Sequence, residues 1–128
     1  MKEPHWLLSE TVRGLQERIL AEFGGLSGLR DAGLFNSAMA RPHQLFSYGK
    51  PDLFDLAAAY AFGIARNHPF VDGNKRTAFV ASFTFLYING MIVTSPHAEN
   101  YRQFVALAAG ELDEQALAVW FRANTAPR

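Results

Sequence analysis

The chain has no cysteine, no net charge and no apolar run long enough to cross a membrane. The absence of cysteine excludes disulfides and thiolate metal ligands. Twelve Lys and Arg balance twelve Asp and Glu, which argues against a protein whose main role is to neutralise nucleic-acid phosphates. No N-terminal signal peptide is evident. We therefore expect a cytoplasmic protein that acts neither on membranes nor directly on nucleic acid.

Hydrophobic residues make up 49% of the 128 positions, and phenylalanine alone contributes 11. This content favours a packed core over disorder, and the length is that of one domain. Residues 53–65 and 77–88 are apolar nearly all round and long enough for helices, a pattern typical of buried central helices. The sequence predicts an all-α, compact helical bundle, a single domain over residues 1–128, with these two helices at its centre.

A polar loop, His68–Arg76, joins the two apolar stretches. Pro69 disfavours helical geometry at His68 and should end the first helix there. Gly73 permits a positive φ, and Asn74 is predicted to cap the second helix. A polar loop between two buried helices indicates a function beyond chain reversal.

The charges of this loop indicate an anion pocket. Lys75 and Arg76 fall in the first turn of the second helix, where a cation opposes the helix dipole at a cost of about 0.3–1 kcal/mol. Free backbone N–H groups, a permissive glycine and two cations suit phosphate groups best. His68 is a candidate general base and Asp72 a candidate Mg²⁺ ligand. Arg66 either complements the helix dipole or contacts a nucleotide or target.

The loop sequence His-Pro-Phe-Val-Asp-Gly-Asn-Lys-Arg resembles the signature of the Fic/Doc family, H-x-F-x-[DE]-G-N-[GK]-R, at every fixed position. The short chain, with Asn74–Ala78 opening an apolar helix, resembles the Doc (death-on-curing) branch. Two positions differ from Fic-type AMP transferases: Lys75 replaces a glycine, and Phe79 stands where a second arginine is usual. In the family, the Lys accompanies reversed nucleotide binding, so that the γ-phosphate is transferred instead of AMP.

The resemblance implies the toxin of a toxin–antitoxin pair, acting as an ATP-dependent protein Ser/Thr kinase with ATP and Mg²⁺ as cofactors. It suggests elongation factor Tu as the target, growth arrest as the result and a cognate antitoxin as a partner. His68 would take the proton of the target hydroxyl, and Asp72 would orient His68 or hold Mg²⁺. The residues expected to contact nucleotide are Gly73, Asn74, Lys75, Arg76 and Arg66.

Two other functions remain open. One is AMP transfer to a hydroxyl, as in the longer Fic proteins. The other is a non-catalytic module that keeps the pocket to hold a nucleotide or a regulator. Taken singly, His68, Asp72 and the Lys75-Arg76 pair are also compatible with a helix end, a cap and a solvated face.

Residues 43–51 are the least helical part of the chain, and the preceding helix is expected to end before Pro42. The residue pattern alone favours a connecting loop. The resemblance favours the family's flap, an extended piece beside the active site that pairs with a target segment by strand addition. The expected flap residues are Leu45, Phe46, Ser47 and Tyr48. An amphipathic antitoxin tail is expected to fold over this apolar segment.

The remaining predictions concern caps and the C-terminal region. Asp31, Asp52 and Asp113 are expected to cap helices, residues 91–94 to form a brief strand, and residues 124–128 to fray. Ser95–Asn100 matches the [ST]-x-x-x-E-[GN] pattern by which many Fic proteins inhibit themselves. In that family the Glu pairs with the second arginine, which is Phe79 here. We therefore interpret the match as coincidental and expect restraint to come from the antitoxin.

Overall fold

The computed structural model describes residues 1–128 and contains six helices and one two-stranded sheet. The elements are α1 (Ser9–Phe23), α2 (Ala32–Tyr48), α3 (Leu53–Asn67), α4 (Asn74–Ile88), β1 (Met91–Val93), α5 (His97–Ala108), α6 (Glu114–Ala123) and β2 (Thr125–Pro127). The predicted all-α class is confirmed. None of the helices combines the length and the apolar character needed to span a bilayer.

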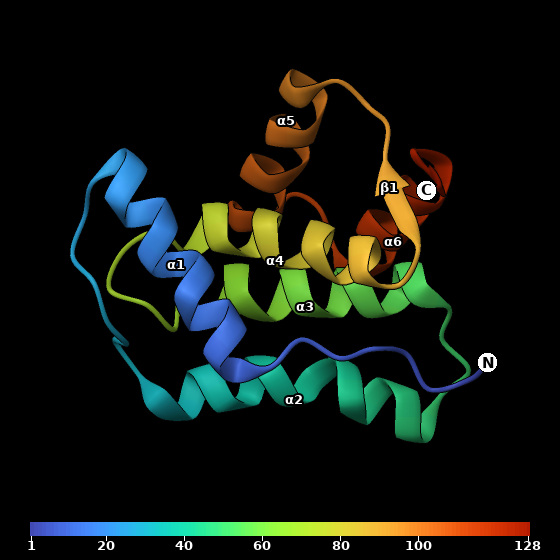
Figure 1. The fold of residues 1–128 in the computed structure, drawn as a ribbon, viewed down its shortest axis with the longest axis horizontal. Helices are drawn as coiled ribbons and strands as arrows, with labels where there is room; N and C mark the ends of the chain where they lie inside the picture. The colour runs from blue at the N-terminus through green and yellow to red at the C-terminus, as the bar shows by residue number, and fades with distance from the viewer.

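Helix α3 is the centre of the molecule. It packs against α2, α4, α5 and α6, and Figure 1 shows α2 and α4 on either side of it, with α1 crossing α4. Small side chains permit this crowding, since alanines fill much of α3 and are fully buried. At Gly63 an added Cβ would lie 3.1 Å from Ala38 Cα on α2. The two predicted central helices are therefore confirmed as α3 and α4, but only α3 is buried nearly all round: Tyr87 and Ile88 on α4 are exposed.

The three aspartates that were predicted to cap helices do so. The side chain of Asp31 accepts from Leu34 N, and that of Asp113 accepts from Ala116 N. Asp52 accepts from Asp55 N, whose own carboxylate accepts from Asp52 N. Each bond satisfies an N–H group that lacks a partner within its helix.

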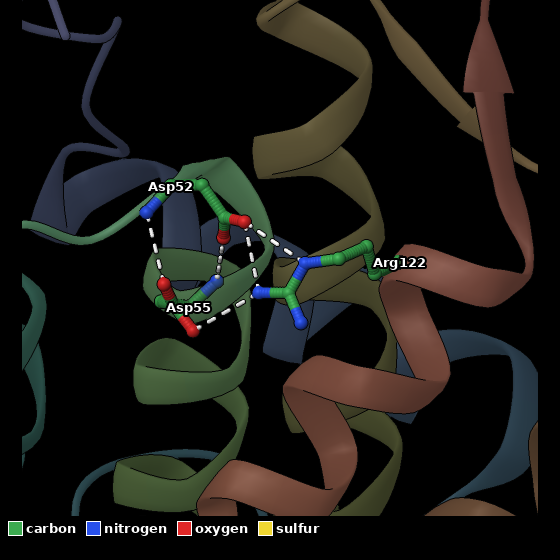
Figure 2. Close-up of polar contacts among 3 residues, drawn as sticks. All are labelled: Asp52, Asp55 and Arg122. Atoms are coloured by element: carbon green, nitrogen blue, oxygen red, sulfur yellow. Dashed lines mark hydrogen bonds and ion pairs between the residues drawn. The ribbon is translucent and has the colours of Figure 1, made fainter.

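A guanidinium joins the start of α3 to the end of α6. Figure 2 shows Arg122 contacting the carboxylates of both Asp52 and Asp55, at 2.8 Å and 3.3 Å. Burial opposes ionisation of Asp52, but the Asp55 N–H and the Arg122 guanidinium outweigh burial and lower the pKa of Asp52. The hydrogen bond to Asp52 in turn raises the pKa of Arg122. The ends of two helices that are far apart in sequence are thus tied together at the surface.

Helix α2 does not end before Pro42, so that prediction was wrong. The helix continues through a buried Pro42 to Tyr48, although proline removes one backbone bond and costs about 3 kcal/mol in a helix interior. Burial explains the continuation, because Leu45 and Phe46 extend the same apolar face and pack half-buried against the core. The Trp6 ring meets Phe46 edge-on at 5.6 Å.

The C-terminal tail does not fray, so that prediction was also wrong. Residues Thr125–Pro127 form β2, which pairs antiparallel with β1 so that Ile92 faces Ala126. Arg128 N donates to Gly90 O at 3.0 Å, and Arg128 Nε donates to Tyr87 O. The predicted strand after α4 is confirmed as β1, and the tail is its partner.

Candidate functional site

Two buried side chains, Phe70 and Asn74, hold the loop between α3 and α4 in its conformation. Phe70 is 1% exposed and its ring packs edge-on against Phe35 at 5.4 Å. The amide of Asn74 spans the loop, accepting from Phe70 N at 2.9 Å and donating to Phe70 O at 3.0 Å. The expectation that Asn74 caps α4 was therefore wrong: Gly73, with φ of 79°, occupies the N-cap position, and Asn74 is the first helical residue.

His68 ends α3 in a strained conformation. Its φ and ψ are 49° and 55°, and it is the one non-glycine residue of the chain with a positive φ. The left-handed region costs a residue with a Cβ about 1–2 kcal/mol, so the surrounding contacts must hold it. The side chain is exposed, and its Nδ1 lies 3.5 Å from Asn74 Nδ2. Because the Phe70 backbone fixes the orientation of the Asn74 amide, an N–H₂ group faces the imidazole.

The start of α4 offers unpaired donors beside this imidazole. Thr77 N is the first backbone group to bond back, to Gly73 O at 2.9 Å. The preceding N–H groups, from Asn74 to Arg76, have no acceptor within the helix, as at any helix N-terminus. They form a partial positive charge that favours an anion.

The two cations of the loop rest on aromatic rings. The Arg76 guanidinium lies 3.8 Å from the ring centre of Phe23, and Lys75 Nζ lies 5.5 Å from that of Tyr101. Both cations line a cavity of about 180 Å³ between α1, α4 and α5, together with Phe79. Because a cation is attracted to the face of a ring, both charges are held at the edge of this cavity.

Phe79, at the position of the family's second arginine, belongs to a cluster of aromatic side chains. Its ring stacks on Phe83 at 4.4 Å and meets Phe104 edge-on at 5.1 Å. Glu99 pairs with Arg102 on its own helix at 2.7 Å. No cation therefore stands at position 79 for Glu99 to neutralise.

Asp72 contacts a segment of the chain that the sequence did not indicate. Its Oδ2 accepts from Leu26 N at 2.7 Å, and its backbone oxygen accepts from Gln16 Nε2 at 3.0 Å. Neither contact orients His68. As an oxygen donor at a loop expected to hold phosphates, Asp72 suits Mg²⁺, which commonly binds through one carboxylate, water and phosphate.

The extended piece beside the loop is the segment of residues 24–31, not residues 45–48. Leu29 forms an isolated antiparallel bridge with Phe70, and Val71 N donates to Gly28 O at 3.1 Å. Figure 1 shows the expected flap residues at the opposite end of α2, where they are helical. The expectation that Leu45, Phe46, Ser47 and Tyr48 form an extended piece beside the loop was wrong. The glycine-rich sequence of residues 24–28 was the available signal.

Arg30 in this segment is a further residue that sequence reasoning missed. Its Nε donates to His68 O at 2.7 Å and its Nη2 donates to Asn67 O at 2.9 Å. Arg66, which was expected to contact nucleotide, turns elsewhere: its guanidinium lies over Phe62 and against Gly110. The structure therefore brings His68, Asp72, Gly73, Asn74, Lys75 and Arg76 together and leaves Arg66 aside.

The fold and the loop define a class: a small all-α domain whose central helix pair carries, at its turn, a histidine beside an anion-attracting helix N-terminus. A model of the Fic/DOC family matches residues 6–86. Over 101 residues, covering 73% of this chain and 77% of the relative, the chain is 46% identical to "Toxin Doc" of Mycolicibacterium smegmatis. Over 111 residues, covering 85% and 86%, it is 32% identical to "Protein kinase doc" of Escherichia phage P1.

The chain belongs to the Fic/Doc family. The match to the family model includes the loop signature His68–Arg76, and both relatives carry the name Doc. The predicted branch of the family is thereby confirmed.

Proposed function

We propose that this chain, as one Fic/Doc domain over residues 1–128, is a toxin that transfers the γ-phosphate of ATP to a Ser or Thr hydroxyl of a protein. The names of the two relatives, one a toxin and one a protein kinase, support this proposal. The observation that carries it is the placement of His68 at the lip of a helix N-terminus that bears Lys75 and Arg76. The imidazole thus lies beside the start of α4, with His68 Nδ1 3.5 Å from Asn74 Nδ2.

The reaction follows from these positions. The imidazole of His68 accepts the proton of the target hydroxyl, whose oxygen forms a bond to the γ-phosphorus. The bond between that phosphorus and the β,γ-bridging oxygen breaks, and ADP leaves with the electron pair. Lys75, Arg76 and the free N–H groups of α4 stabilise the charge on the phosphate oxygens, which is most of what a protein contributes to phosphoryl transfer. Mg²⁺ held through Asp72 would supply further charge neutralisation.

Phe79 favours γ-phosphate transfer over AMP transfer. In place of a second phosphate-binding arginine, α4 presents an aromatic ring packed between Phe83 and Phe104. Lys75 occupies the position of the AMP-transferase glycine, and its charged side chain lines the same cavity as Phe79. One phosphate subsite of the AMP-transferase arrangement is therefore replaced by packing, while a cation is added beside it.

The segment 24–31 is the better candidate for docking a target. It is largely exposed, extended at Leu29 and joined to the loop by backbone hydrogen bonds. An extended target segment paired with it would bring a hydroxyl next to His68. The target suggested by the resemblance is elongation factor Tu.

The antitoxin is proposed to cover the outward face of α4. Val80 lines three adjoining hollows there, of about 180, 330 and 590 Å³, which extend towards Phe83 and Tyr87 on one side and towards Leu15 on the other. Lys75 stands at the edge of the first. An amphipathic antitoxin segment with acidic residues would bury the apolar groups and complement the cations.

The test of the proposed function is a transfer assay with ATP labelled at either the α or the γ phosphate, using cell lysate and purified elongation factor Tu. Wild type should transfer only the γ label, and His68→Ala should transfer none while keeping the wild-type melting temperature. His5→Ala is the matched control, because His5 is exposed and its backbone bonds to Asn89, at the end of α4 away from the loop. Transfer of the α label would favour AMP transfer, and transfer of neither label would favour a binding module.

Expression in cells tests the toxin assignment separately. Wild type should arrest growth, His68→Ala should not, and co-expression of the adjacent reading frame should restore growth. Tyr87→Glu, in the part of the outward face of α4 away from Lys75 and Arg76, should retain transfer but escape that rescue. Harmless expression of wild type, at a level verified by blot, would contradict the assignment.

A further inference from the structure

Arg30 binds three successive carbonyls at the end of α3. Its guanidinium donates from Nε to His68 O at 2.7 Å and from Nη2 to Asn67 O at 2.9 Å. Its backbone N–H donates to Pro69 O at 2.7 Å. Arg30 thus binds the backbone of His68 and of both its neighbours, Asn67 and Pro69.

These carbonyls need an outside donor. The last carbonyls of a helix have no partner within it, and a cation at that end complements the negative end of the helix dipole. His68 has in addition left the helical region for φ of 49°, a conformation that a residue with a Cβ rarely keeps unless its contacts fix it. Bonds to the carbonyls of both Asn67 and His68 fix the peptide groups that define this conformation.

The fork shape of the guanidinium suits this arrangement. Two N–H groups in one rigid plane span neighbouring carbonyls, which a lysine ammonium on a flexible stem does not reproduce. The Arg30 backbone is itself held, since the adjacent Leu29 pairs with Phe70 across the loop. The direction of the two donors is therefore set by the same short pairing that joins the segment to the loop.

We propose that Arg30 is a positioning residue that holds His68 in its left-handed conformation and so directs the imidazole at the phosphate cradle. The inference rests on the proposed function of His68 as the base. It gives the segment 24–31 a second role, because the segment lies where a target would dock and also maintains the geometry of the base. Loss of the guanidinium then lowers the rate of transfer without weakening nucleotide binding.

A capping role alone makes a different prediction. If Arg30 only stabilised the end of α3, its removal would lower the melting temperature and leave the turnover number unchanged. Arg41 provides the matched control, because it is an exposed arginine on α2 whose guanidinium pairs with Glu114 away from the loop. Arg41→Gln removes an arginine contact of comparable exposure and should leave transfer unchanged.

The experiment compares wild type, Arg30→Gln, Arg30→Lys and Arg41→Gln in the γ-label assay and by NMR. For Arg30→Gln we expect kcat to fall roughly 10- to 100-fold, the size of effect that a misplacement of about 1 Å produces, with KM for ATP unchanged. Arg30→Lys should retain part of the rate. The backbone carbon shifts of His68 should report a positive φ in wild type and Arg41→Gln and lose that signature in Arg30→Gln. In wild type, the Arg30 Nε–H should exchange slowly.

Each outcome is decisive. Unchanged kcat and unchanged His68 shifts in Arg30→Gln overturn the proposal, as does an equal loss of rate in Arg41→Gln. If wild type itself transfers no label, the proposed function fails, and the His68 shifts alone decide whether Arg30 holds the conformation. If Arg30→Gln does not fold, Arg30→Lys and the exchange of the wild-type Nε–H decide instead, rapid exchange of that proton counting against the contact.

Discussion

Two glycines inside helices should respond to the same substitution with opposite sign. Gly14 lies in α1 and Gly63 in α3, and both have ordinary helical conformations. Replacing a helix-interior glycine by alanine restricts the unfolded chain and stabilises the helix by about 0.5–1 kcal/mol. A Cβ at Gly14 would meet nothing within 4 Å. Gly14→Ala should therefore raise the free energy of unfolding by about 0.5–1 kcal/mol.

Gly63 faces the closest approach of two helices. A Cβ there would lie 3.1 Å from Ala38 Cα, 3.2 Å from Ala38 Cβ and 3.2 Å from Ala38 O. Two of these atoms are backbone, which cannot rotate away, so α2 has to shift. The crowding is local to Pro42, whose missing N–H leaves the Ala38 carbonyl, four residues earlier, without its usual helical donor. Overpacking of this kind costs about 1–3 kcal/mol, which exceeds the helix gain.

The net expectation for Gly63→Ala is a loss of about 1 kcal/mol in the free energy of unfolding, which is the difference between the middle values of the overpacking cost and the helix gain. Urea titration of wild type, Gly14→Ala and Gly63→Ala, followed by circular dichroism, measures both effects. The double variant should show additive changes, because the two sites share no contacts. A stabilised Gly63→Ala protein would refute the inferred tightness of the α2–α3 contact.

Three other perturbations test the loop between α3 and α4 and the ion pair of Arg122 with Asp52 and Asp55. Asn74→Ala leaves the Phe70 N–H without its acceptor and should lower the free energy of unfolding by about 1–3 kcal/mol; a urea midpoint equal to that of wild type would contradict this role. Lys75→Gly should reduce γ-label transfer by roughly 10²-fold and permit some α-label transfer. Lys75→Met keeps the side-chain volume without the charge, so it should reduce γ-label transfer without permitting α-label transfer. The Arg122 ion pair contributes stability that is present at neutral pH and is lost as pH falls through the depressed pKa of Asp52. Arg122→Gln should therefore cost less than about 1 kcal/mol at pH 7, because the pair is half-exposed, and should flatten the acid limb of the unfolding curve; an acid limb as steep as that of wild type would contradict it.

Sequence alone predicted that Tyr60 is buried but not which group its hydroxyl contacts. Burial raises the pKa of Tyr60 to about 12, although the hydrogen bond from Leu7 N partly opposes that change. Tyr60 lies in an apolar stretch, so its burial was expected. Its hydrogen-bond partner, the backbone N–H of Leu7, lies 53 residues earlier, just before α1, and was not expected.

Local sequence determined the two central helices, the loop between them and the three aspartate caps. Period and apolar content set a buried helix, and a cap requires only a side chain and an N–H group three residues later. The family signature placed His68–Arg76 at one site for the same reason, since the residues are contiguous. These features depend on contacts that span at most a few positions.

Only the tertiary structure decided the path of α2 through Pro42, the pairing of the tail with β1, and the contacts of Asp72 and Arg30. Each depends on groups brought together from distant parts of the chain. Core burial outweighed the local preference of proline, and a free strand edge gave the tail its partner. Sequence alone did not indicate the contacts of the segment 24–31, because its partners, the carbonyls at the end of α3, lie almost forty residues further on. Local propensity carries no information about donors and acceptors that meet only after the helices have packed.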